Sequence, residues 1–123
     1  MPDEKASPKR RYPYAVRPAG ERLFPGPFPY EVRCKNTSVN SDWEVMCSQI
    51  PNNARRCFDH MATDPQSKPT NANRVTALAG AYEGLYEYEV SGGGRVFYQV
   101  NVVEHQVIIV LASMGHPKGT EPQ

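Results

Sequence analysis

The C-terminal third of the chain carries the residue types that proton transfer and anion binding require. Glu87 and Glu89 lie a few positions before Arg95, and His116 lies near the C-terminus. A carboxylate can accept a proton, and a histidine titrates near neutral pH and can donate one. An arginine stays charged and offers a planar fork of donors. These four side chains are therefore the first candidates for a site.

Three predicted strands must position these candidates, over residues 85–90, 95–100 and 106–113. The first two alternate apolar and polar residues and are joined by Ser-Gly-Gly-Gly, which is typical of a hairpin. Residues 107–112 are apolar without interruption. Such a run predicts a strand covered on both faces, in the interior of a sheet.

The register of this hairpin decides which side chains share the face of Arg95. A two-residue turn at Gly92 and Gly93 would put Tyr86 and Tyr88 beside Arg95 and would turn the glutamates toward the helices. A bulge in the glycine turn would instead place Glu87 and Glu89 beside Arg95. Because burying two unpaired carboxylates is costly, we favour the bulge. Glutamates that merely face solvent on a wet sheet surface are the alternative.

Residues 30–63 predict one strand followed by two helices. Residues 30–35 alternate and read as a half-buried strand. Ser41 and Glu44 have the spacing of a capping box, which predicts the start of the first helix, and Pro51 predicts its end. Asn52 or Asn53 would cap a second helix running to about Thr63. The residues expected in the core recur at helical spacing and are Trp43, Met46, Cys47, Ile50, Ala54, Cys57, Phe58 and Met61.

The outer side of the second helix is expected to carry Arg55, Arg56 and Asp59. After it we expect a loop over residues 64–73 and a short ordered continuation over 74–78, which Gly80 ends. The element order is then strand, helix, helix, strand, strand, strand, which indicates an α+β domain over residues 30–123.

Residues 1–29 form a separate, proline-rich stretch. They contain seven of the 12 prolines, and their six basic and three acidic residues give a net charge of +3. Proline removes backbone donors and fixes φ, so we expect an extended N-terminal extension whose aromatic residues could anchor on the domain. We also expect the domain to stay folded without it.

The remaining composition restricts the class of protein. The whole chain has a net charge of +1, so residues 30–123 carry −2 and lack the basic surface typical of nucleic-acid binders. No stretch approaches the roughly 18 apolar residues that span a membrane, and the N-terminus lacks the apolar run of a secretory signal. The three cysteines show no CxxC spacing, which favours free buried thiols in a cytoplasmic protein.

Residues 30–118 resemble the RelE/ParE superfamily of type II toxins. The resemblance lies in the element order, in VTALAG before the hairpin, in GGRVFYQV and in VIIVLASMGHPK. The combination of WE, NARR and DP with YEVSGGGR and GHPK is similar to an actinobacterial-type branch. The resemblance implies a small antiparallel sheet, β-α-α-β-β-β, with two helices on one face. It also implies a cytoplasmic toxin that a cognate antitoxin holds inactive.

The RelE arm of this family implies an endoribonuclease that cleaves mRNA, free or on the ribosome, without a metal ion or other cofactor. Carried over by position, the resemblance makes Arg95 the phosphate-binding cation, Glu87 the base and His116 the acid. The further RNA-contacting candidates are Glu89, Arg74 and Lys118.

This chain departs from better-known ribosome-dependent members, which have lysines on the strand where it has Glu87 and Glu89. Arg95 could also simply pair with one of these carboxylates at the sheet surface. Two other functions therefore stay open. One is a ParE-like, non-catalytic inhibitor of DNA gyrase, and the other is a non-toxic binding protein with the same fold.

Overall fold

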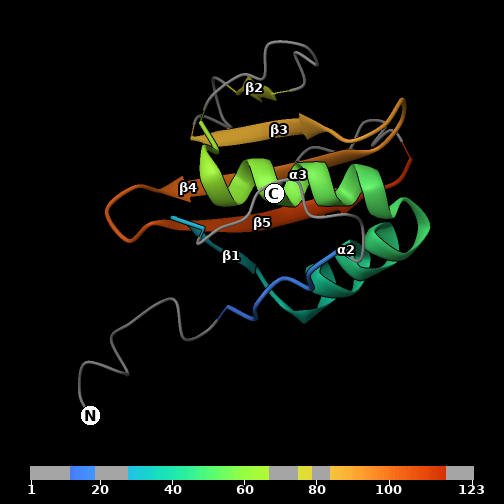
Figure 1. The fold of residues 1–123 in the computed structure, drawn as a ribbon, viewed down its shortest axis with the longest axis horizontal. Coiled ribbons are helices and arrows are strands. Elements are labelled where there is room, and N and C mark those ends of the chain that lie inside the picture. The colour runs from blue at the N-terminus through green and yellow to red at the C-terminus, as the bar shows by residue number, and fades with distance from the viewer. Residues whose placement is uncertain (1–11, 19–27, 67–74, 79–83, 116–123) are drawn as a thin grey trace.

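The computed structural model describes residues 12–18, 28–66, 75–78 and 84–115, drawn in colour in Figure 1. These residues form two helices and five strands, the α+β fold that the sequence predicts. The elements are β1 (Glu31–Cys34), α2 (Thr37–Gln49), α3 (Pro51–Thr63), β2 (Val75–Ala77), β3 (Leu85–Glu89), β4 (Arg95–Asn101) and β5 (Gln106–Ser113). None of the described helices is long and apolar enough to cross a bilayer.

The five strands form one sheet in the order β1-β5-β4-β3-β2. The expected sheet was wholly antiparallel and had four strands, whereas the observed sheet is mixed and has five. Strand β1 pairs parallel with β5, and the long connection that parallel strands require includes both helices. The segment expected as a short continuation contains strand β2, in which Val75 pairs with Tyr88. Strand β5 lies between β1 and β4, which confirms the interior position expected of residues 107–112.

Helix α2 begins earlier than the predicted capping box. Its N-cap is Asn36, whose side-chain oxygen accepts a hydrogen bond from Val39 N at 2.9 Å. This bond satisfies one of the unpaired N–H groups of the first turn, so residues predicted as loop are helical. The expected capping box of Ser41 and Glu44 was therefore wrong, and both residues lie inside the helix.

Helix α3 starts at Pro51, with Ile50 as the junction residue of both helices. Proline is suited to the first helical position because its missing N–H would have no partner there. The predicted caps Asn52 and Asn53 are consequently inside α3, and Asn53 instead donates to Val90 O at 2.7 Å. The predicted end of the helix at Thr63 is confirmed.

One hydrophobic core lies between the sheet and the two helices. Figure 1 views the sheet from the helix side, with α3 in front of β4 and β5. The core contains the predicted helix residues Trp43, Met46, Cys47, Ala54, Cys57, Phe58 and Met61, together with Val32, Cys34, Tyr88, Val96, Tyr98, Val107 and Ile109 from the strands. Both helices therefore cover the same face of the sheet, as expected.

The three cysteines are free and buried, as predicted. Burial raises the pKa of the Cys34 and Cys47 thiols to about 12. They therefore stay protonated near neutral pH and behave as small apolar side chains.

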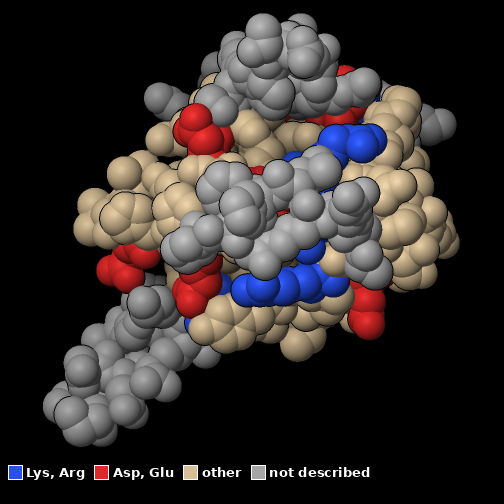
Figure 2. Space-filling model, in the orientation of Figure 1, with Lys and Arg blue, Asp and Glu red and all other residues tan. Residues whose placement is uncertain are grey.

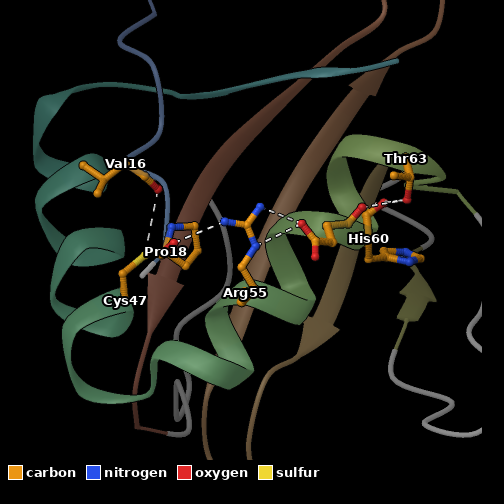
Figure 3. A network of polar contacts seen from close by, with 7 residues as sticks. Val16, Pro18, Cys47, Arg55, His60 and Thr63 are labelled. Atoms are coloured by element: carbon orange, nitrogen blue, oxygen red, sulfur yellow. Dashed lines mark hydrogen bonds and ion pairs between the residues drawn. The ribbon is translucent and has the colours of Figure 1, made fainter. Parts of the chain in front are cut away.

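Residues 12–18, which we call the N-terminal segment, pack against the domain. Beside β1, Ala15 N donates to Val32 O at 3.1 Å and Cys34 N donates to Pro13 O at 2.8 Å. Ala15 is buried, and Trp43 Nε1 donates to Val16 O at 2.6 Å. The segment thus extends the sheet beyond β1 and then passes between α2 and α3, where Figure 3 shows Val16 and Pro18.

An arginine and an aspartate predicted on the outer side of the second helix are in fact buried. Arg55 Nη2 lies 2.7 Å from Asp59 Oδ1, and Arg55 Nη1 donates to Pro18 O at 3.2 Å (Figure 3). The N-terminal segment covers this side of α3, and the pair satisfies its charges internally. The outward placement of Arg55 and Asp59 was therefore wrong.

Candidate active site on the outer face of the sheet

The β3–β4 register brings three predicted site residues together. Glu89 pairs with Arg95, and Glu87 pairs with Phe97. Side chains alternate along a strand, and Tyr88 and Val96 belong to the helix-side core. Glu87, Glu89 and Arg95 therefore lie on the opposite face, which we call the outer face. The preferred register, with both glutamates beside Arg95, is confirmed.

Arg95 is bound on two sides. Its Nε donates to Glu87 Oε2 at 2.9 Å, and its Nη1 donates to Ser91 O at 3.2 Å and to Gly94 O at 2.9 Å. Only 13% of the Arg95 side chain is exposed, against 29% for Glu87. The guanidinium is consequently fixed in one orientation by a cross-strand carboxylate and by the glycine turn.

Two atoms of this arrangement keep unused hydrogen-bonding capacity. Arg95 Nη2 lies 3.8 Å from Glu89 Oε2, which is an ion-pair distance and too long for a hydrogen bond. The other oxygen of Glu87, Oε1, makes no hydrogen bond within the described part of the chain. A donor and an acceptor thus remain available on two side chains that pair with each other. Together they could bind a phosphate oxygen and accept a proton.

The charge of this cluster does not by itself favour an RNA phosphate. Two carboxylates and one guanidinium give a formal charge of −1. Figure 2 shows the helix side of the molecule. Acidic and basic side chains are both scattered over the described surface there, and neither kind forms a continuous patch. The remaining predicted site residues, Arg74, His116 and Lys118, lie outside the described residues.

The two other histidines lie away from the cluster. The His60 ring is on α3 and packs against Tyr88 at 5.4 Å, on the core side of β3. Its Nε2 is buried and has no hydrogen-bond partner among the described residues, and burial lowers the pKa of His60. His105 is in the turn after β4, at the opposite end of that strand from Arg95, and its ring packs against Tyr30. Neither histidine is therefore placed to donate a proton at the Glu87–Arg95 pair.

A cavity of about 700 Å³ lies elsewhere, between the N-terminal segment, β1, α3 and the turn before β5. Its lining includes Tyr14, Tyr30, Phe58 and His105 but none of the predicted site residues. Among the residues that the structure describes, no three His, Cys, Asp or Glu side chains are grouped to hold a metal ion.

Sequence reasoning missed the contribution of the glycine turn to this site. The stretch Ser91–Gly94 predicted a turn, but the residue types do not reveal that two of its carbonyl oxygens would bind Arg95. Only the closeness of Arg95 to the turn in sequence offered a signal.

No protein-family model matches the chain, and no curated protein sequence matches it significantly. Among solved structures, it is similar to a chain of the toxin–antitoxin complex RelBE2 from Mycobacterium tuberculosis. The TM-score is 0.43 and the sequence identity 19%, over 69% of this chain and 96% of that chain. A likeness this distant carries no assignment of family or function.

Proposed function

We propose that this chain is the toxin of a type II toxin–antitoxin pair, a metal-independent endoribonuclease that cleaves mRNA in the cytoplasm. The observation that carries the proposal is the Glu87–Arg95 pair, joined at 2.9 Å, with Glu87 Oε1 and Arg95 Nη2 left for a substrate. The sequence resemblance to RelE-type toxins supplies the substrate class and the expected antitoxin partner.

In the proposed reaction, Glu87 Oε1 takes the proton of a ribose 2′-hydroxyl. The 2′-oxygen then attacks the adjacent phosphorus, and the bond from phosphorus to the 5′-oxygen breaks. Arg95 Nη2 donates to a non-bridging oxygen, on which negative charge develops. His116 is the proposed donor of the proton that the departing 5′-oxygen takes up. The products are a 2′,3′-cyclic phosphate and a 5′-hydroxyl, so no cofactor is consumed.

Arg74, Lys118 and Glu89 are the proposed RNA contacts. The two cations are needed in this scheme because the described cluster has a formal charge of −1 and would otherwise repel a phosphate. Binding to mRNA on the ribosome would have to overcome the same repulsion.

That negative charge favours a second candidate. A non-catalytic inhibitor of ParE type acts through contacts with a protein such as DNA gyrase and needs no phosphate-binding cation. In that case the Glu87–Arg95 pair stabilises the hairpin and does no chemistry. A non-toxic binding protein with this fold is the third possibility, and it differs from the other two in causing no growth arrest.

The test is induced expression in a bacterial host, with growth and RNA 5′-ends followed together for the wild type, Arg95→Ala and Arg33→Ala. Arg33 is a matched control because it also lies on the outer face and pairs with a glutamate at 2.9 Å. We expect the wild type and Arg33→Ala to arrest growth and produce new 5′-ends, provided both accumulate as folded protein. Arg95→Ala should lose both effects, with a fall in cleavage rate of about 10²–10³-fold.

Three other results would redirect the proposal. Growth arrest without new RNA ends would favour the ParE-like candidate. New ends that persist in a folded Arg95→Ala variant would remove the site from the outer face. A folded wild-type protein that causes no arrest would favour the binding protein.

A further inference from the structure

The turn that precedes Arg95 is closed by two internal hydrogen bonds. Val90 N donates to Gly94 O at 3.0 Å, and Gly94 N donates to the Ser91 hydroxyl oxygen at 2.9 Å. A Cβ atom at Gly94 would lie 2.7 Å from both Ser91 Oγ and Val90 Cγ2. Any other residue at this position would force the Ser91 and Val90 side chains to move, and would thereby disturb the bond from Gly94 N to the Ser91 hydroxyl.

The closed turn presents two carbonyl oxygens to one nitrogen of Arg95. Ser91 O and Gly94 O accept from Arg95 Nη1 at 3.2 and 2.9 Å. The Ser91 hydroxyl contacts neither Arg95 nor Glu87. It connects the two residues whose carbonyl oxygens bind the guanidinium, because Gly94 N donates to it.

We propose that Ser91 is a positioning residue for Arg95. Its hydroxyl fixes the turn so that Nη1 is bound by the turn and Nε by Glu87. This arrangement leaves Nη2 as the nitrogen that faces a substrate. This inference rests on the proposed function in so far as Arg95 binds the scissile phosphate. The orientation of Arg95 can nevertheless be measured without any substrate.

A matched control exists at the other end of β4. There, Glu104 N donates to Asn101 Oδ1 at 2.9 Å, again from a backbone N–H to a side chain three residues earlier. Asn101→Ala therefore removes a turn bond of the same kind and length, away from Arg95. If Ser91 only stabilises its turn, the two alanine variants should behave alike.

The experiment compares wild type, Ser91→Ala, Ser91→Thr and Asn101→Ala as purified full-length proteins. Initial rates of cleavage of a single-stranded RNA oligonucleotide give kcat and KM. We expect Ser91→Ala to lower kcat about 10-fold with KM within about 3-fold, because a small displacement of a positioned group mainly affects the transition state. Ser91→Thr should restore the rate because it keeps the hydroxyl, and Asn101→Ala should match wild type.

The second readout is the NMR signal of the Arg95 Nε–H group, assigned with Arg95→Lys. We expect its ¹H–¹⁵N heteronuclear NOE to fall in Ser91→Ala and to stay at the wild-type value in Asn101→Ala. An Arg95 side chain equally rigid in both alanine variants would overturn the inference, as would equal kcat values. If no variant cleaves RNA, the proposed function fails, and the NMR comparison still decides the role of Ser91.

Discussion

Among the described residues, two arginine–glutamate pairs lie on the outer face of the sheet, and the contact that joins each pair has nearly the same geometry. Arg33 Nε contacts Glu31 on β1, and Arg95 Nε contacts Glu87 across β4 and β3, both at 2.9 Å. The arginine side chains are 12% and 13% exposed. The strand registers place both arginines on one face, because Arg33 pairs with Ile108, which pairs with Gln99 of β4.

The pairs differ in how completely their polar atoms are satisfied. Arg33 Nη2 also donates to Glu31 Oε2, at 3.3 Å, Nη1 donates to Tyr12 O, and the guanidinium lies 3.7 Å from the centre of the Tyr14 ring. Glu31 accepts further bonds from Tyr14 and Gln106. Each oxygen of Glu31 thus accepts two hydrogen bonds, so the β1 pair offers no free carboxylate oxygen to a ligand, and we interpret it as structural.

The Glu87–Arg95 pair is less complete, since Glu87 Oε1 and Arg95 Nη2 make no hydrogen bond within the described residues. Functional sites often retain polar groups that only a substrate completes, and structural ion pairs do not need them. An arginine–glutamate contact alone therefore does not identify a functional site. The atoms that it leaves unused separate a candidate site from a structural pair.

The largest expected difference between the two pairs is in catalysis. We predict that Glu87→Gln lowers the RNA cleavage rate by about 10²–10⁴-fold, because it removes the proposed general base and keeps the side-chain shape. Glu31→Gln should stay within about 3-fold of wild type, because both oxygens of Glu31 are occupied by hydrogen bonds within the β1 pair and its neighbours. Single-turnover cleavage of an RNA oligonucleotide by both purified variants measures this difference.

Thermal unfolding of both variants supplies the control, since a rate measured on partly unfolded protein is meaningless. Equal rates for Glu87→Gln and wild type would remove Glu87 from the mechanism. A large loss of cleavage rate in a folded Glu31→Gln variant would show that the β1 pair also takes part in catalysis.

The position of Glu87 and Glu89 on the face of Arg95 could be predicted from sequence because the cost of burying unpaired carboxylates dominates the choice of register. The alternative register turns both glutamates toward the helices, and unpaired buried carboxylates are costly enough to decide a register. The helix core residues were predictable for the same reason, since apolar residues at helical spacing have one favourable environment.

The surroundings of Arg55 and Asp59 could not be predicted in this way. Both are charged and were expected to face solvent, yet each is more than 90% buried. Their third partner is the carbonyl oxygen of Pro18, in a proline-rich stretch that shows no strand or helix pattern. A backbone oxygen is present at every residue, so the sequence carries no signal for this contact. The parallel pairing of β1 with β5 could not be predicted either, because it depends on how distant segments pack and not on a local sequence pattern.

The second-largest predicted effect is on stability and concerns the N-terminal segment. This segment contacts the Arg33–Glu31 pair through Tyr12 and Tyr14. We predict that removing residues 1–18 lowers the free energy of unfolding by about 2–3 kcal/mol. Trp43 Nε1 and Arg55 Nη1 would lose their acceptors, and each unsatisfied buried donor costs roughly 1–3 kcal/mol. The extension therefore contributes to stability, while the domain is still expected to stay folded without it. Urea unfolding of the purified proteins measures the change.

A truncation that starts at residue 12 keeps all of these contacts and is the reference for that measurement. Equal stability of the two truncations would show that the N-terminal segment contributes nothing to the fold. Among cleavage-competent proteins, we also expect the longer truncation to keep its rate per folded molecule, since none of the described contacts of Arg95 involves residues 12–18.

The smallest predicted effect is a pH dependence of stability that arises from Glu31 of the β1 pair. The hydrogen bond from Arg33, aided by those from Gln106 and Tyr14, lowers the pKa of Glu31 from 4.5 to about 2. Above pH 4.5 the carboxylate is ionised in both the folded and the unfolded chain, and its stabilisation is complete. As pH falls from 4.5 to 2, the unfolded chain takes up the proton first and the stabilisation is lost.

Urea unfolding between pH 2 and 6 tests this dependence by comparing wild type with Glu31→Gln. We expect the stability advantage of wild type to shrink by about 1 kcal/mol across this range. The full linkage value would be larger, but the Glu31 side chain is 34% exposed and solvent screens the pair. Subtracting the variant removes the titration of the other carboxylates from the comparison. A constant difference from pH 6 to pH 2 would mean that the β1 pair is not held in solution as tightly as its contacts indicate, and Arg33 would then lose its value as the control for Arg95.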